Sequence, residues 1–355
     1  MILLHALQLN IATSDPLAFP LQVASPHAAP ILSYVRHLTL KTPVDPSSAP
    51  RVIFVQKVAD IVAAFPRLKT LTLGHMYLRV EHLKQPIFCR DLDRLSLVDV
   101  CSGSTADSVI GTLSSLYNMR KVRMTNINFS SSSVSPSRSV PANLTHVHTL
   151  TVRSHVFTAS IVDFFVRGSL RKLGVRCSSV LDTRALGSFL TSCDSSLEHL
   201  SLEFNARRRP PPSLGDLPQQ LRQCNSLTAL SLRITLASQW RATAAALRVV
   251  SQLVSGLPVG VRTLAIAVAV DASANFNAAF CRGFAAALAQ ELASLDEIGG
   301  DLAVMRVCWL WTTPRGQDVV LCEALKKQLS HVVRAQYPAL VRKGMLFFSK
   351  DDVRH

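Results

Sequence analysis

The chain has 355 residues, of which 48% are hydrophobic and 17% charged, and its mean hydropathy is +0.26. This composition excludes a disordered chain, which has too few apolar residues to form a core. The longest apolar run, seven residues at 264–270, is far shorter than the ~18 residues of a membrane-spanning helix. The 38 Lys and Arg exceed the 23 Asp and Glu, so the formal charge of +15 favours acidic partners.

The first twelve residues and the cysteines indicate a compartment. Residues 1–12 are apolar but lack the Lys or Arg that opens a secretory signal, and they are more typical of a buried strand. The eight cysteines lie far apart and contain no C-x-x-C pair. We therefore expect reduced thiols, no membrane association and an intracellular location, either cytoplasmic or nuclear.

The chain begins with a predicted strand at 3–11, followed by a loop and a short helix that precede a repeated L-x-x-L-x-L pattern. Nine copies align when other apolar residues are accepted at the Leu positions, and successive copies end 23 to 34 residues apart. This spacing overlaps the range of about 20 to 29 residues that is typical of leucine-rich repeats. The copies lie at 35–40, 68–73, 92–97, 119–124, 147–152, 170–175, 197–202, 227–232 and 261–266.

Apolar residues of helical period precede five of the copies, at 58–65, 109–116, 186–190, 214–224 and 250–257. One helix and one short strand cannot enclose a core, whereas stacked units can. The pattern predicts an α/β leucine-rich-repeat solenoid, with a curved parallel sheet on the concave side and helices on the convex side. The consensus Asn after each strand is present only at Asn205, so we expect irregular repeats. An ordinary α/β domain with parallel strands is the alternative.

The two ends depart from the repeat. After residue 270 we expect an Ala-rich helix at 275–295, a strand at 302–311, a helix at 318–336 and a last strand at 345–348. Terminal units of a solenoid cover an exposed core and are usually atypical. The predicted organisation is a lead-in strand and cap at 1–30, the solenoid at 31–270, and atypical repeats with a cap at 271–355.

Three stretches resemble the leucine-rich-repeat half of fungal F-box-type proteins: the opening Leu-rich strand, the segment 24–40, and the Phe-Pro-Arg-Leu-Lys-Thr-Leu-Thr-Leu run at 65–73. In that family an F-box of a ubiquitin-ligase adaptor docks on Skp1, and the repeats bind the substrate. Residue 1 already lies where the strand after the F-box would be, and nothing ahead of Leu38 has an F-box pattern. The resemblance therefore implies substrate recognition, and a Skp1-like subunit is not expected for this chain.

The residues that alternate with the buried positions of each strand face the concave side. Eight of these 27 positions are Lys or Arg, and Glu203 is the sole acid. Small residues flanked by basic ones suit an acidic protein segment, because Arg binds carboxylates through two parallel hydrogen bonds. The alternative is that these charges only keep the protein soluble. The predicted partner-binding residues are Arg94, Lys121, Arg123, Arg153, Lys172, Arg176 and Arg233.

Other classes of function have weaker support. Stacking of nucleic-acid bases is poorly provided, since only Phe204 is aromatic beside the face. His146 and His148 share a strand face without a nearby Cys, Asp or Glu. We predict no catalytic, cofactor-binding or metal-binding residues and no cofactor. The expected function is a non-enzymatic protein-interaction module, with a basic nucleic-acid-binding solenoid or a divergent relic without a partner as alternatives.

Overall fold

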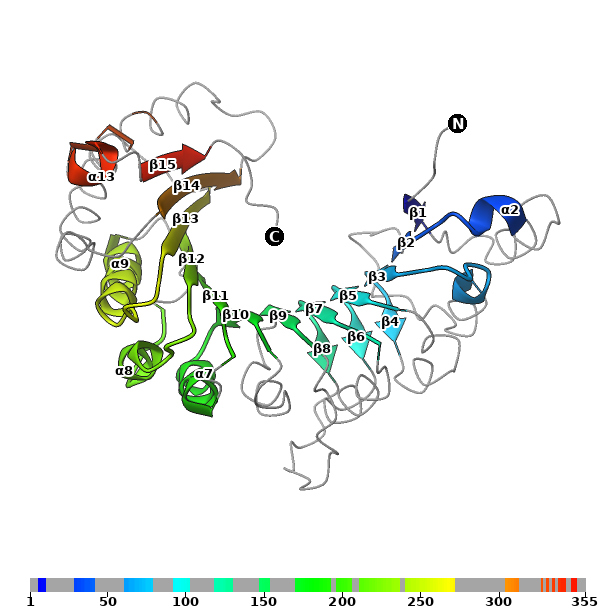
Figure 1. The fold of residues 1–355 in the computed structure, drawn as a ribbon, viewed down its shortest axis with the longest axis horizontal. Coiled ribbons are helices and arrows are strands. Elements are labelled where there is room, and N and C mark those ends of the chain that lie inside the picture. Colours follow the sequence, from blue (N-terminus) through cyan, green and yellow to red (C-terminus); the bar gives the residue numbers. More distant parts are fainter. Residues whose placement is uncertain are drawn as a thin grey trace. The chain divides into compact units, whose positions relative to one another are not determined.

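The structure is a computed structural model that divides the chain into two compact units, unit 1 at Met1–Leu170 and unit 2 at Arg171–His355. Each unit is described by itself (Figure 1). The structure describes residues 6–10, 29–41, 61–78, 92–102, 118–129, 147–153, 170–192, 196–205, 211–236, 240–271, 304–312, 327, 330, 331, 334, 335, 338–342 and 346–349.

Unit 1 contains a parallel sheet in which neighbouring strands follow chain order. The short helix α2 (Ala29–Leu32) precedes β2, as predicted. Five of the six strands come from copies of the L-x-x-L-x-L pattern, and the sixth is the lead-in strand, which pairs with β2. The strands are β1 (Ala6–Asn10), β2 (His37–Lys41), β3 (Thr70–Gly74), β5 (Arg94–Val98), β7 (Lys121–Thr125) and β9 (Thr149–Arg153).

A second, three-stranded parallel sheet follows the first in unit 1 and was not predicted. Its strands are β4 (Tyr77–Leu78), β6 (Cys101–Ser102) and β8 (Asn128–Phe129). The chain reaches each of them through a residue with positive φ, namely His75, Asp99 and Asn126, at 52° to 55°. Their side chains form a ladder, since Asn126 Nδ2 donates to Asp99 Oδ1 at 2.8 Å and His75 Nδ1 lies 3.5 Å from Asp99 Oδ2. Asp, Asn and His tolerate this conformation better than most residues.

Unit 2 continues the repeat with longer strands, which also pair in parallel and in chain order. The four repeat strands are β10 (Lys172–Cys177), β11 (His199–Asn205), β12 (Ala229–Leu236) and β13 (Thr263–Asp271). The predicted C-terminal strands are present as β14 (Val304–Thr312) and β15 (Leu346–Ser349), and they extend the same sheet. The short helix α13 (Pro338–Arg342) precedes β15.

Helices alternate with these strands and lie along one side of them (Figure 1). They are α7 (Val180–Ser192), α8 (Leu217–Arg222) and α9 (Trp240–Ser255), which pack in series. A capping box begins α7, because Asp182 accepts the N–H groups of Ser178 and Ser179 at 2.9 Å each, and its own N–H donates to Ser179 Oγ at 3.2 Å. Asp182 is therefore buried with its hydrogen bonds satisfied.

The apolar positions of the predicted alternation are buried in all nine repeat strands, and most of the outward positions are at least partly exposed, although Gly74, Gly174, Glu203 and Ala267 are buried. In β3, for example, Leu71 and Leu73 are fully buried while Thr70 and Thr72 are partly exposed. The helical positions 186, 189, 190, 217, 221, 250 and 253 are buried as well. Since equivalent residues pair across neighbouring strands, one apolar stack fills the core of each unit. The fold is a leucine-rich-repeat solenoid.

Several expected elements lie partly or wholly outside the described residues. The expected helices at 109–116 and 275–295 lie outside the described residues. Of the helix expected at 318–336, residues 327, 330, 331, 334 and 335 are described, and all five are helical. No helix in the described ranges is long and apolar enough to cross a membrane.

Candidate protein-binding face

Unit 1 brings three of the predicted basic residues together. Arg94 on β5 pairs in register with Lys121 on β7, and Ser96 pairs with Arg123. All three cations are exposed, because their neighbours Leu95, Val122 and Met124 take the buried positions. Arg153, at the end of β9, is partly buried and pairs in register with Thr125.

Unit 2 holds the other three predicted residues. Lys172 is exposed at the start of β10. Arg176 forms an ion pair with Glu203, with Nη2 to Oε1 at 2.7 Å and Nε to Oε1 at 3.0 Å, and the two side chains are only 15% and 8% exposed. Glu203 pairs in register with Arg233 on its other side. The guanidinium of Arg176 is thus already held by an internal carboxylate, and Glu203 lies between two arginines.

A second row of charges was missed in the sequence. It consists of the residue directly before each repeat strand, which corresponds to the first variable position of the L-x-x-L-x-L pattern. Five of these nine residues are Lys or Arg. This position could have been found by comparing the copies column by column, but simple strand alternation does not include it. We call it the edge row: Arg36, Lys69, Asp93, Arg120 and His148 in unit 1, and Arg171, Glu198, Thr228 and Arg262 in unit 2.

Backbone hydrogen bonds hold the edge row in place. The carbonyl of Asp93, for example, accepts the N–H groups of Arg120 at 2.9 Å and Lys121 at 3.0 Å. The same two-donor arrangement recurs at the carbonyls of Arg36, Lys69, Arg120, Arg171, Glu198 and Thr228. The edge row therefore lies on a regular backbone and not on a loose loop.

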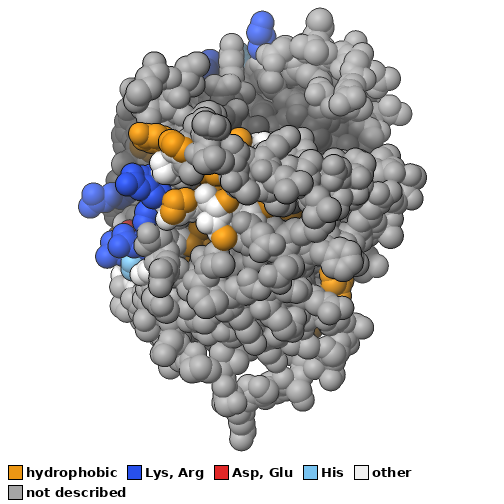
Figure 2. All heavy atoms as spheres, turned by 90° about the vertical axis from the view of Figure 1, so that its right-hand side faces the viewer, with side chains coloured by type: hydrophobic (Ala, Val, Ile, Leu, Met, Phe, Trp, Pro, Cys, Tyr) orange, Lys and Arg blue, Asp and Glu red, His pale blue; other side chains and the backbone are white. Residues whose placement is uncertain are grey.

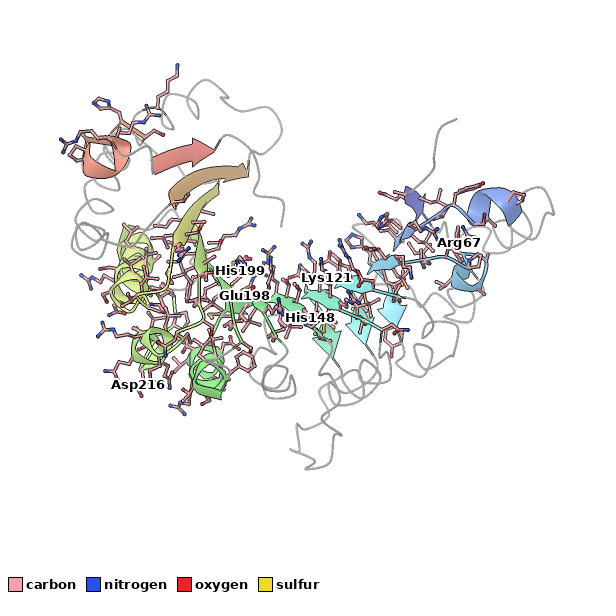
Figure 3. The ribbon with its side chains drawn as sticks, viewed as in Figure 1. Arg67, Lys121, His148, Glu198, His199 and Asp216 are labelled. Atoms are coloured by element: carbon pink, nitrogen blue, oxygen red, sulfur yellow. The ribbon has the colours of Figure 1, made fainter. Side chains whose placement is uncertain are left out.

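The cations are most concentrated around β5 and β7. We call the exposed residues Arg94, Arg120, Lys121 and Arg123 the β5–β7 patch. Asp93 lies at its margin and contacts Arg94 Nε at 3.3 Å and Arg120 Nε at 3.9 Å. Figure 3 shows nitrogen-tipped side chains gathered on unit 1 where Lys121 is labelled, with His148 close by. In Figure 2, Lys and Arg side chains gather at one edge of the described surface.

The described residues offer little for covalent or metal chemistry. Burial, reinforced by the charge of Asp182, raises the pKa of the Cys177 thiol far above its ordinary value, so this thiol is no nucleophile at neutral pH. Among the described residues no group of three His, Cys, Asp or Glu is placed to hold a metal ion. His148 is exposed, and His146 lies outside the described residues. The chemistry that the face offers is the binding of anions by exposed guanidinium and ammonium groups.

His199 makes the stability of unit 2 depend on pH. Partial burial lowers its pKa below the ordinary value of 6.5, Lys172 lowers it further, and Glu198 opposes the shift. The folded state therefore binds this proton less readily than the unfolded state, so the free energy of unfolding falls as the pH decreases below about 6.5. We expect His199→Gln to reduce that fall, as measured by urea unfolding between about pH 5 and pH 7.5. The control is His37→Gln in unit 1, which should leave the pH dependence of the stability of unit 2 unchanged.

The similarity of this chain to known proteins is one of fold. No protein-family profile matches the chain, and no curated protein matches it. Among solved structures, it is similar to a chain of the TLR13–ssRNA13 complex, with a TM-score of 0.39 and 14% identity over 81% of this chain. The match spans only 38% of that chain's length. The chain is also similar to an internalin (InlF) of Listeria monocytogenes, with a TM-score of 0.38 and 13% identity, covering 88% of this chain and 84% of that one.

Proposed function

We propose that this chain is a non-enzymatic protein-interaction module that binds an acidic protein segment on the strand face of its solenoid. The single observation that carries the proposal is the β5–β7 patch, in which four exposed cations lie on, or directly before, two hydrogen-bonded strands, with Asp93 as the neighbouring carboxylate. A surface of one sign accelerates encounter with a partner of the opposite sign and discriminates against like-charged ones. Arg94, Arg120 and Arg123 can each hold a carboxylate through two hydrogen bonds.

The other predicted residues have graded roles in this proposal. Lys172 and Arg233 give the strand face of unit 2 basic side chains of its own. Arg153 and Arg176 are more buried, and Arg176 already binds Glu203. We therefore expect these two residues to contribute mainly to the positive electrostatic potential near the strands and less to direct contacts. The resemblance to fungal F-box-type proteins supports a role as the substrate-recognition part of a ubiquitin-ligase adaptor, in the cytoplasm or nucleus.

A protein partner is favoured over a nucleic acid by the surroundings of the cations. Single-stranded nucleic acids are held by aromatic side chains on which bases stack. Phe204, the one aromatic residue beside the face in the sequence, is fully buried and cannot stack on a base. The middle positions of the described strands hold mostly small residues such as Thr72, Ser96 and Thr151. Their hydroxyl groups suit hydrogen bonds to side chains and backbone of a peptide.

Charge reversal tests this function. We expect Lys121→Glu combined with Arg123→Glu to weaken the binding of a fluorescent Asp/Glu-rich peptide about tenfold or more, because two attractions become repulsions. Fluorescence anisotropy at low and at physiological salt measures the effect, with the Asn/Gln counterpart of the peptide as the uncharged control.

The matched control variant reverses two exposed arginines on helices of unit 2, Arg184 on α7 and Arg248 on α9, and produces the same change in net charge. Equal losses of affinity in the two variants would mean that only net charge matters, and would contradict the proposed face. Tight, steeply salt-dependent binding of an RNA oligonucleotide without binding of the acidic peptide would favour the nucleic-acid function instead.

A further inference from the structure

Basic side chains recur from strand to strand in unit 1. One or more cationic or His side chains occur at every strand from β3 to β9, close to the amino end: Lys69, Arg94, Arg120 with Lys121, and His148. The register places Arg94 beside Lys121, and the edge row is linked from strand to strand by backbone hydrogen bonds. Since neighbouring strands lie about 4.8 Å apart, the surface presents a Lys, Arg or His side chain about every 4.8 Å in this direction.

The period of this row distinguishes between shapes of partner. An α-helix returns the same side to the surface every 5.4 Å or so, with side chains at i, i+3 and i+4 forming one stripe. An extended chain presents same-side residues only about every 6.6 Å. Over the three intervals from β3 to β9, the row advances roughly 14 Å, a helix roughly 16 Å and an extended chain roughly 20 Å. A helix therefore stays nearly in step with the row, whereas the side chains of an extended segment run ahead of it by about one strand spacing.

The strand positions beside the row carry mostly short side chains. Next to the amino-end cations, the middle positions of β3, β5 and β9 hold Thr72, Ser96 and Thr151, which are short and partly exposed. Arg123 is the long side chain in this column on β7. A helix lying over the row could place a second carboxylate, up to one turn away from the first, within reach of Arg123.

We propose that the occupant of the unit 1 face is an acidic α-helix that lies across the strands, with a stripe of Glu or Asp at i, i+4 and i+7 facing Lys69, Arg94, Lys121 and Arg120. This inference rests on the proposed function, because it specifies the shape of the acidic partner. The helix axis runs perpendicular to the strands and parallel to the edge row. Affinity comes mainly from charge, so it decreases as the salt concentration rises.

Three labelled peptides of about 18 residues with the same number of Glu residues test the inference. The first places Glu in one helical stripe, the second scatters the same Glu around the helix, and the third alternates Glu with Pro and stays extended. We expect the striped peptide to bind full-length protein about five- to tenfold more tightly than the other two, since each lost exposed ion pair weakens binding roughly two- to fivefold. Its helix content, measured by circular dichroism, should increase on binding.

Two pairs of variants locate the binding. Arg94→Gln with Lys121→Gln, and separately Arg120→Gln with Arg123→Gln, should remove most of the preference for the striped peptide, while Arg184→Gln with Arg248→Gln should retain it. All these side chains are exposed, and thermal unfolding checks that the variants fold.

The outcomes separate the two proposals. If all three acidic peptides bind equally and lose affinity in the patch variants, the acidic-partner function stands and the helical partner is wrong. If the extended peptide binds best, the acidic-partner function also stands, and the proposal that the partner is helical is wrong. If no acidic peptide binds and an oligouridine of about ten nucleotides does, both proposals are overturned.

Discussion

Replacing Glu203 with leucine is expected to lower the free energy of unfolding of unit 2 by about 3 kcal/mol. Its carboxylate holds Arg176 at 2.7 Å and is only 8% exposed, and its register neighbour on the other side is Arg233. Removing it leaves two guanidinium groups close together in a poorly hydrated part of the sheet. Urea unfolding followed by tryptophan fluorescence reports on this unit, because Trp240, Trp309 and Trp311 are the three tryptophans of the chain.

A double substitution distinguishes loss of charge balance from loss of shape. Arg176→Met combined with Glu203→Leu removes both charges, and we expect its stability to return to within about 1 kcal/mol of the parent, because the cost of desolvating the pair disappears with it. If the double variant is as unstable as the single one, the pair does not act as an electrostatic unit and the packing of Glu203 itself is what matters.

The sequence was sufficient to predict the strands. In each copy, two or three apolar residues at alternating positions must be buried on one side of a strand, and the burial of Leu71, Leu95 and Leu230 follows directly from that period. The parallel order follows from the length of chain between copies, which allows a return crossover but no tight hairpin. The outward position of Arg94, Lys121 and Arg123 is a consequence of the same alternation.

The sequence was not sufficient for features that depend on register between distant residues. Arg176 and Glu203 are 27 residues apart, and only the pairing of β10 with β11 places them side by side. For this reason the prediction treated Arg176 as an open partner-binding residue, although an internal carboxylate occupies it. Likewise, the edge row depends on backbone hydrogen bonds between repeats, in which the carbonyls of seven of its residues each accept two N–H groups from the next repeat.

The second large effect on stability is expected at the position where regular leucine-rich repeats carry Asn. In unit 1 this position holds Met76, Val100 and Ile127, which are 1%, 1% and 2% exposed, so an apolar column replaces the usual amide ladder. We expect Ile127→Asn to lower the free energy of unfolding of unit 1 by about 3 to 5 kcal/mol. Loss of the buried side chain accounts for about 1.5 to 3 kcal/mol, and an amide without partners costs about 1 to 3 kcal/mol more.

Hydrogen exchange measured by mass spectrometry on peptides covering β7 and β8 locates the effect, with tryptophan fluorescence as the internal reference for unit 2. Ile127→Val, which keeps the apolar column, should cost only about 1 kcal/mol. Restoring a consensus residue normally stabilises a repeat protein, so the sign of the change is informative. If the Ile127→Asn variant is as stable as the parent, the turns at Asp99 and Asn126 still offer hydrogen-bond partners to an amide. A loss of several kcal/mol would mean that the repeats of unit 1 depend on apolar packing where regular repeats depend on hydrogen bonds, and this would explain why their spacing varies from 24 to 33 residues.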